Sequence, residues 1–135
     1  MVVGEEDFRK TVAVDVDGVL AYWQHGMRRK GVIGEPNPGA REFMIFLKEC
    51  GHRIVVYTTR CKIMPSIESG IGAVVLQERI VQWLALHDIP YDEVYIGQGK
   101  PFADAYVDDR AVECRPQSDW DAWQKARLRV EELTK

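Results

Sequence analysis

Short runs of β-branched and aromatic residues alternate with helical patterns along this chain, and this alternation constrains its fold most strongly. The strand-like runs are residues 11–15, 53–58, 93–96 and 105–107. Between the first three runs, apolar residues recur at helical spacing over about 37–50 and 75–87. Strands separated by helices pair in parallel, because each connection returns the chain to the same end of the sheet. The pattern therefore predicts an α/β sandwich, with a mainly parallel sheet and helices on its faces.

The first helix has clear boundary signals. Asn37 followed by Pro38 predicts a helix start, with Asn as the N-cap and Pro at the first helical position. Gly51 predicts its end, because glycine readily adopts the left-handed conformation of a C-terminal cap. The apolar face is expected to carry Phe43, Phe46 and Leu47.

The other helices are predicted from apolar spacing. The second helix is expected to bury Leu76, Ile80, Trp83, Leu84 and Leu86. A closing helix is expected to begin with Ser118 as its N-cap, and its stripe consists of Trp120, Trp123, Arg127, Val130 and Leu133. Pro and Gly break any period over 61–74, which predicts an irregular loop there.

Length and composition predict one ordinary globular domain, 1–135. The chain has 135 residues, of which 46% are hydrophobic and 29% charged. Eighteen basic against 21 acidic residues give a net charge of −3, which disfavours a nucleic-acid partner without excluding it. No apolar stretch approaches membrane-spanning length, and the acidic start does not resemble a signal peptide. We therefore expect a cytoplasmic protein that does not engage a membrane; its oligomeric state stays open.

The three cysteines give no framework for a disulfide or a zinc site. Cys50, Cys61 and Cys114 are odd in number, widely spaced and without a C-x-x-C pair. We expect them to be reduced thiols that pack as small apolar side chains.

Polar side chains gather just after the predicted strands. They are Asp15, Asp17, Thr58, Thr59, Lys100, Asp108 and Asp109. The carboxyl ends of parallel strands share one edge of the sheet, where ligands usually bind. Clustered carboxylates repel one another, and a hard divalent cation such as Mg²⁺ removes that cost. With a lysine and hydroxyls added, the set predicts a site for a phosphoryl group.

These residues occur in the order of four known motifs. The segment 15–20, D-V-D-G-V-L, follows an apolar strand and resembles the first motif of the haloacid dehalogenase (HAD) superfamily. Thr58 at the end of a strand resembles the second motif, Lys100 in G-K-P the third, and Asp108-Asp109 the fourth. The resemblance spans residues 11–110 and implies a Rossmann-like three-layer sandwich.

The resemblance also implies a role for each motif residue. Asp15 would be the nucleophile that becomes an aspartyl-phosphate, and Asp17 the general acid and then the general base. The presence of Asp17 favours a phosphatase over a dehalogenase. Thr58 and Lys100 would bind the phosphoryl group, with Thr59 beside them. The implied magnesium ligands are Asp15, the Asp17 backbone carbonyl and Asp108, with Asp109 orienting ligands or metal-bound water.

The spacing of the motifs leaves no room for a cap domain of about 50 residues or more, since each gap already supplies a loop, a helix and a strand. The expected protein is thus capless, with its site bordered only by the 21–37 and 61–74 segments. Trp23 and the basic residues 28–30 would form a wall for the substrate; a solvated turn is the alternative.

The function expected from these motifs is that of a magnesium-dependent phosphomonoester hydrolase. Its short form resembles capsule-biosynthesis phosphatases and the phosphatase domain of polynucleotide kinase. The acidic net charge favours a small phosphorylated substrate, such as a sugar or nucleotide phosphate, over a polynucleotide end or a phosphoprotein. A non-hydrolytic phosphoacceptor or regulatory domain is the alternative of another class. Phosphoacceptor domains of the receiver type place their acidic pair first, whereas here it comes last.

Overall fold

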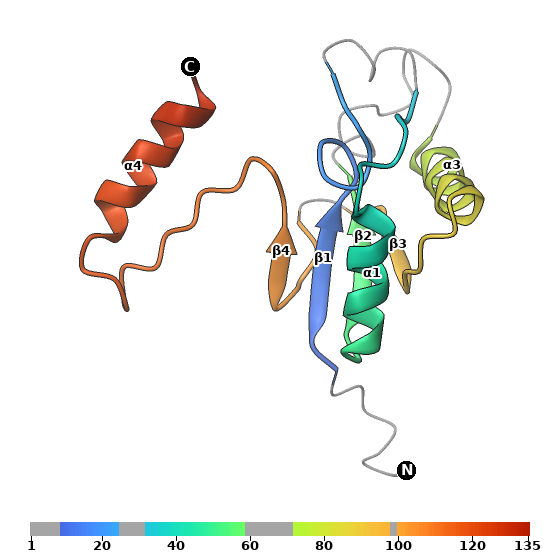
Figure 1. The fold of residues 1–135 in the computed structure, drawn as a ribbon, viewed down its shortest axis with the longest axis horizontal. Coiled ribbons are helices and arrows are strands. Elements are labelled where there is room, and N and C mark those ends of the chain that lie inside the picture. The colour runs from blue at the N-terminus through green and yellow to red at the C-terminus, as the bar shows by residue number, and fades with distance from the viewer. Residues whose placement is uncertain (1–8, 25–31, 59–71, 98–99) are drawn as a thin grey trace.

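A four-stranded parallel sheet forms the centre of the molecule (Figure 1). The structure, a computed structural model, describes residues 9–24, 32–58, 72–97 and 100–135. The strands are β1 (Thr11–Asp15), β2 (Arg53–Tyr57), β3 (Glu93–Tyr95) and β4 (Ala105–Val107), and the helices are α1 (Ala40–Glu49), α3 (Ala73–Leu86) and α4 (Ala122–Leu133). The strand order is β3-β2-β1-β4, with every neighbouring pair parallel. The predicted α/β, Rossmann-like class is confirmed, and the described elements include no cap domain.

The core lies on the face of the sheet that the even-numbered residues of β1 share with their register partners. Val12 pairs with Ile54 and Val14 with Val56, and all four side chains are buried in one apolar cluster. Helix α1 lies over this face, and α3 is seen nearly end-on beside β3 (Figure 1). The cluster takes Met44 from α1. The side chains of Ala13, Asp15 and Tyr57 belong to the opposite face, because side chains alternate along a strand.

Helix α1 begins later than the sequence predicted, and Asn37 is not its N-cap. Gly39 holds that position with a φ of 88°, so the turn into the helix uses a left-handed residue instead of a side-chain cap. The Asn37 side chain donates a hydrogen bond to the Val19 carbonyl at 2.9 Å. Asn37 therefore stabilises the loop after β1 and does not cap the helix that follows it. Gly51 has the predicted left-handed conformation, with a φ of 83°.

The predicted buried face of α1 is wrong in two of its three residues. Phe43 and Phe46 are exposed, and Phe46 is 54% accessible. The helix instead buries Ala40, Met44 and Leu47, which follow the same helical period on a neighbouring face. The sequence favoured the face with Phe43 and Phe46 because these side chains are larger and more apolar than Ala40 on the face that is buried.

Helices α3 and α4 also depart from expectation. Leu76, Ile80, Trp83 and Leu84 are buried as predicted, whereas Leu86 in the last turn of α3 is 77% exposed. Helix α4 begins at Ala122 with Asp121 as its N-cap, so Ser118 precedes it by a turn. Ala122 is its only buried residue. None of the described helices combines the length and apolar character needed to cross a membrane.

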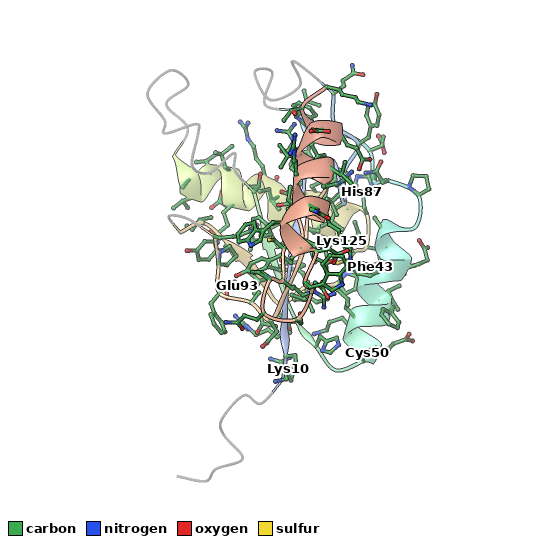
Figure 2. The ribbon with its side chains drawn as sticks, turned by 90° about the vertical axis from the view of Figure 1, so that its left-hand side faces the viewer. Lys10, Phe43, Cys50, His87, Glu93 and Lys125 are labelled. Carbon is green, nitrogen blue, oxygen red and sulfur yellow. The ribbon has the colours of Figure 1, made fainter. Side chains whose placement is uncertain are left out.

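Helix α4 lies beyond β4, at the edge of the sheet. Figure 1 shows it separated from β4 by the connecting chain, and Figure 2, viewed from that side, shows it in front of the sheet with Lys125 labelled. The apolar stripe predicted for packing is accordingly exposed, with Trp120 at 91% and Trp123 at 71%.

Asp92, just before β3, connects β3 to the start of β2 and to the end of α1. Its carboxylate accepts hydrogen bonds from the Ile54 backbone at 2.7 Å and from Lys48 Nζ at 2.9 Å, and it lies 3.7 Å from Arg9 Nη1. Burial alone would raise the pKa of Asp92, but the Ile54 N–H and the Lys48 ammonium outweigh it and lower this pKa below its ordinary value. The ionised carboxylate therefore stabilises the junction between α1, β2 and β3.

We predict that Asp92→Asn lowers the free energy of unfolding by about 1 to 2 kcal/mol at pH 7, because charge-assisted hydrogen bonds are lost. Since the pKa is lower in the folded state, this contribution is present above the unfolded pKa and disappears as the pH falls through the folded value. Urea unfolding at pH 7 and in strong acid would measure it. Asp88→Asn, at an exposed ion pair with Arg41, is the control and should cost much less. An equal cost for both variants at pH 7 would contradict the assignment.

Candidate functional site

Three carboxylates meet at the carboxyl ends of two adjacent strands. Asp15 is the last residue of β1, and Asp108 and Asp109 follow β4 directly. The register pairs Val14 with Val107, so Asp15 and Asp108 occupy the next position on their strands. One oxygen from each of Asp15, Asp108 and Asp109 can be chosen so that all three lie within 4.8 Å of one another. The sequence prediction that these residues come together is thus consistent with the structure.

Burial and the nearby carboxylates perturb the pKa of Asp15. Burial is the largest cause that raises its pKa from 3.8 to about 7, and the charges of Asp108, Asp109 and Asp17 contribute to the same rise. A hydrogen bond from the Val16 N–H to Asp15 Oδ1, at 2.8 Å, opposes the shift. In the protein without a cation, burial and the neighbouring charges therefore favour the protonated form of Asp15.

The donor set fits a hard divalent cation. Carboxylate oxygens are the ligands that Mg²⁺ prefers, and it needs only a few from the protein because it keeps several waters. The cluster has three such groups and no His or Cys among the described residues that form it. Asp15, Asp108 and Asp109 would hold the ion, whose charge removes the repulsion that raises the pKa of Asp15.

Asp108 is held by two donors. The Tyr57 hydroxyl donates to Asp108 Oδ2 at 2.9 Å, and the Arg110 backbone N–H donates to Oδ1 at 2.8 Å. Burial and this hydrogen bond both raise the pKa of Tyr57, so the phenol keeps its proton and stays a donor. Sequence reasoning missed Tyr57. Its position at the end of β2, where it pairs in register with Asp15, was the available signal.

The loop after β1 closes tightly against Asp109. The Gly18 N–H donates to the Ala21 carbonyl at 2.9 Å, and the Ala21 N–H donates to the Val16 carbonyl at 2.9 Å. Gly18 has a φ of 84°, and a Cβ there would collide with the Asp109 carboxylate, lying 3.0 Å from its Cγ. Only glycine therefore satisfies both the turn and the close approach of Asp109.

Asp17 and Thr58 adjoin this cluster and are both buried. Thr58 directly follows Tyr57 at the end of β2, and Asp17 lies two residues beyond Asp15. The carboxylate of Asp17 is not one of the three that converge, although its charge contributes to the raised pKa of Asp15.

Lys100, the third-motif residue, contacts the Tyr106 ring instead of the carboxylate cluster. It precedes β4, is exposed, and its Nζ lies 4.4 Å from the centroid of the Tyr106 ring. The Tyr106 hydroxyl donates in turn to the Pro101 carbonyl at 2.7 Å. This cation–π contact holds the ammonium beside β4. Thr59 and most of the 61–74 segment lie outside the described residues, as do residues 28–30.

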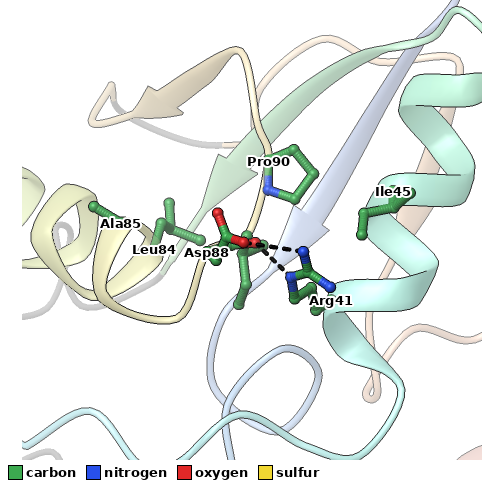
Figure 3. A pocket seen from close by; sticks show the side chains of 7 residues that line it. Arg41, Ile45, Leu84, Ala85, Asp88 and Pro90 are labelled. Atoms are coloured by element: carbon green, nitrogen blue, oxygen red, sulfur yellow. Dashed lines mark hydrogen bonds and ion pairs between the residues drawn. The ribbon is translucent and has the colours of Figure 1, made fainter.

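A hollow between α1 and α3 carries no comparable chemistry (Figure 3). It has a volume of about 260 Å³ and is lined by Arg41, Ile45, Leu84, Ala85, Asp88, Ile89 and Pro90. The Arg41 guanidinium lies 3.0 Å from Asp88 Oδ2 and also donates to the Asp88 carbonyl at 2.9 Å. The two charged groups that line it therefore neutralise each other.

Comparison with known proteins identifies similar folds only. No protein-family model and no curated protein matches the chain. A conserved protein from Bacteroides thetaiotaomicron has a similar structure, with a TM-score of 0.53 and 24% identity over 91% of this chain and 92% of the other. A crystal structure from Vibrio cholerae gives a TM-score of 0.49 and 28% identity over 91% of this chain and 98% of the other. The first likeness supports the α/β fold, and neither bears on the reaction.

We predict that Gly18→Ala impairs metal binding more than its backbone strain alone explains. Gly51 has almost the same φ, 83°, and a Cβ added there would meet nothing within 4 Å, so Gly51→Ala is a matched control for strain. Both variants should lose about 1 to 2 kcal/mol of stability. Only Gly18→Ala should also weaken Mg²⁺ binding, by about tenfold or more, because it displaces Asp109. Calorimetric titration would measure this, and equal metal affinities would contradict the packing argument.

We also predict that Asp15→Asn stabilises the metal-free protein at pH 8 and has a much smaller effect at pH 4. The pKa of Asp15 is higher in the folded state, so its contribution to stability falls as the pH rises from about 4 to about 7. Asparagine removes the charge and still accepts the Val16 N–H. Melting temperatures in the presence of a chelator would test this, with the exposed Glu113→Gln as control. Destabilisation by Asp15→Asn at pH 8 would contradict it.

Proposed function

We propose that this protein is a magnesium-dependent phosphomonoester hydrolase that acts through an aspartyl-phosphate on Asp15. The observation that carries the proposal is the convergence of Asp15, Asp108 and Asp109, one oxygen of each lying within 4.8 Å of the others. Such a cluster repels an anionic substrate until a cation is bound. The buried Asp17 beside it adds a proton-transfer group. The motif order of the chain, which resembles the HAD superfamily, supports the same reaction.

The bound Mg²⁺ would supply charge neutralisation for the transferring phosphoryl group and for the nucleophile. The chain's own residues account for the bond changes. An oxygen of Asp15 forms a bond to phosphorus as the bond to the leaving oxygen breaks, and Asp17 gives that oxygen its proton. Asp17 then takes a proton from water, whose oxygen attacks phosphorus and releases phosphate from Asp15.

The remaining motif residues would bind the phosphoryl oxygens. Thr58 has a hydroxyl at the end of β2, close in sequence to Tyr57, which holds Asp108. The Lys100 ammonium lies on the Tyr106 ring, and a phosphate dianion would compete with that ring for the charge. Cation–π contacts at exposed sites contribute only about 0.5 to 1 kcal/mol, so this exchange costs little.

The substrate class favoured is a small phosphorylated metabolite. The described residues include no cap domain to enclose a substrate, and the net charge of −3 gives no general attraction for a polynucleotide. A polynucleotide end or a phosphoprotein is the alternative, which the acidic net charge disfavours.

Substitution of the two first-motif aspartates tests the mechanism. With Mg²⁺ and an activated aryl phosphate, we expect Asp15→Asn to release no phosphate and to form no phosphoenzyme. Asp17→Asn should be slower by about 10² to 10⁴ and should accumulate phosphate on Asp15, because proton transfer to a good leaving group matters less than activation of water. Acid-quenched protein mass spectrometry with peptide mapping would locate the phosphoryl group.

Two controls sharpen this test. Asp104→Asn should retain activity, because Asp104 accepts the Thr11 N–H at 2.8 Å at the opposite end of β4. A chelator should abolish turnover and Mg²⁺ should restore it. Phosphate found on Asp108 or Asp109, or full activity in excess chelator, would refute the proposed mechanism. A stable phosphoenzyme in the wild type without phosphate release would instead support a phosphoacceptor domain.

A further inference from the structure

A groove beside the carboxylate cluster has no role in the mechanism so far. It has a volume of about 600 Å³ and is lined by Asp109, Arg110, Val112, Val130, Leu133 and Thr134. It therefore lies between the chain that leaves β4 and the C-terminal end of α4. Figure 1 shows α4 rising toward the end of the molecule to which β1 and β4 point. Because Asp109 belongs both to this groove and to the cluster, the groove opens next to the proposed reaction centre.

The size and lining of the groove suit part of a small molecule. Ligand pockets commonly measure about 300 to 1,000 Å³ and combine apolar walls with a few polar groups. Here Val112, Val130 and Leu133 supply apolar wall, and Arg110 supplies a charged donor. The Thr134 hydroxyl donates to the Val130 carbonyl at 2.7 Å, so it offers the groove an acceptor oxygen. The C-terminal turn of α4 therefore forms one wall of the groove, while the outer surface of the helix is exposed.

Arg110 is the cation of this groove. Its guanidinium carbon lies 5.2 Å from the centroid of the Trp23 ring, a distance within the range of a cation–π contact. Its backbone N–H is bound to Asp108, which fixes the residue beside the cluster. The described residues give the guanidinium no carboxylate partner within ion-pair distance, although Arg127 and Arg129 on α4 are paired with Glu131 and Glu132.

Trp23 packs against Arg110 but does not line the groove. Its indole Nε1 is buried and has no hydrogen-bond acceptor among the described residues. Because this N–H is buried, the indole offers no donor to a ligand in the groove. The role of Trp23 is therefore to orient the Arg110 guanidinium.

We propose that this groove binds the leaving group of the substrate and that Arg110 recognises a second anionic group on it, such as a carboxylate or another phosphate. This inference rests on the proposed function, because it assumes that the reacting phosphoryl group lies at Asp15. Four aspartates surround that position, and they would repel a second anion without a cation nearby. The planar fork of arginine suits carboxylate and phosphate, and its contact with Trp23 orients it in advance. Arg110 is thus a specificity-determining residue.

A matched pair of non-hydrolysable ligands tests this without turnover. Para-carboxybenzylphosphonate and para-carbamoylbenzylphosphonate have almost the same shape and differ in one negative charge. In calorimetric titrations with Mg²⁺, we expect the wild-type protein to bind the carboxylate form about tenfold more tightly. Arg110→Met should abolish the preference, and Arg110→Lys should keep part of it. Arg127→Met, which removes an arginine paired with Glu131, should preserve it.

The outcomes separate this inference from the proposed function. Equal affinities for the two phosphonates in the wild type, a preference that survives Arg110→Met, or binding of neither ligand would each overturn the role of Arg110. Hydrolysis of phenyl phosphate by the wild type is measured in parallel. Selective, Arg110-dependent binding without any hydrolysis would support the anion site and refute the hydrolase proposal.

Discussion

Electrostatic repulsion among Asp15, Asp108 and Asp109 is the constraint on which the rest of the site depends. The fold brings these carboxylates together although 93 residues separate the first two in sequence, and their mutual charge helps to raise the pKa of Asp15 to about 7. The strand order makes this possible, because β4, the last strand in sequence, pairs with β1, the first. The buried apolar cluster on the other face of β1 and β2 supplies stability that offsets this local cost.

Neighbouring groups fix the positions of the carboxylates in this cluster. Tyr57 and the Arg110 N–H fix the two oxygens of Asp108, and Gly18 allows Asp109 to approach the loop after β1. Asn37 holds that loop from outside through the Val19 carbonyl. Each of these contacts is a hydrogen bond or a close packing contact, and none of them brings a positive side chain to the three carboxylates. The arrangement therefore retains its net negative charge, which is the property that a cation requires.

The sequence predicted the strands and the converging aspartates because these depend on local composition and on general rules for parallel sheets. Strands β1 and β4 have the predicted bounds, and Asp15 and Asp108 follow from them. It did not predict which face of α1 is buried, since Phe46 is more apolar than Ala40 and only tertiary packing decides between them. Tyr57 and Gly39 were missed for a related reason. Their roles depend on register and on backbone conformation, which no residue type encodes alone.

On the proposed function, specificity would reside in the groove beside the cluster, since the described elements include no cap domain. In this fold the segment 108–112 carries two carboxylates of the cluster, Asp108 and Asp109. It also carries two residues that line the groove, the cationic Arg110 and the apolar Val112. On the proposed function, one short stretch of chain attached to an edge strand would therefore set both the phosphoryl position and the leaving-group position. Helix α4 completes the groove from outside while burying only Ala122, so sequence changes in its last turns alter the groove with little cost to the core. On the proposed function, changes in α4 would alter the substrate, whereas β1 and β4 would preserve the reaction.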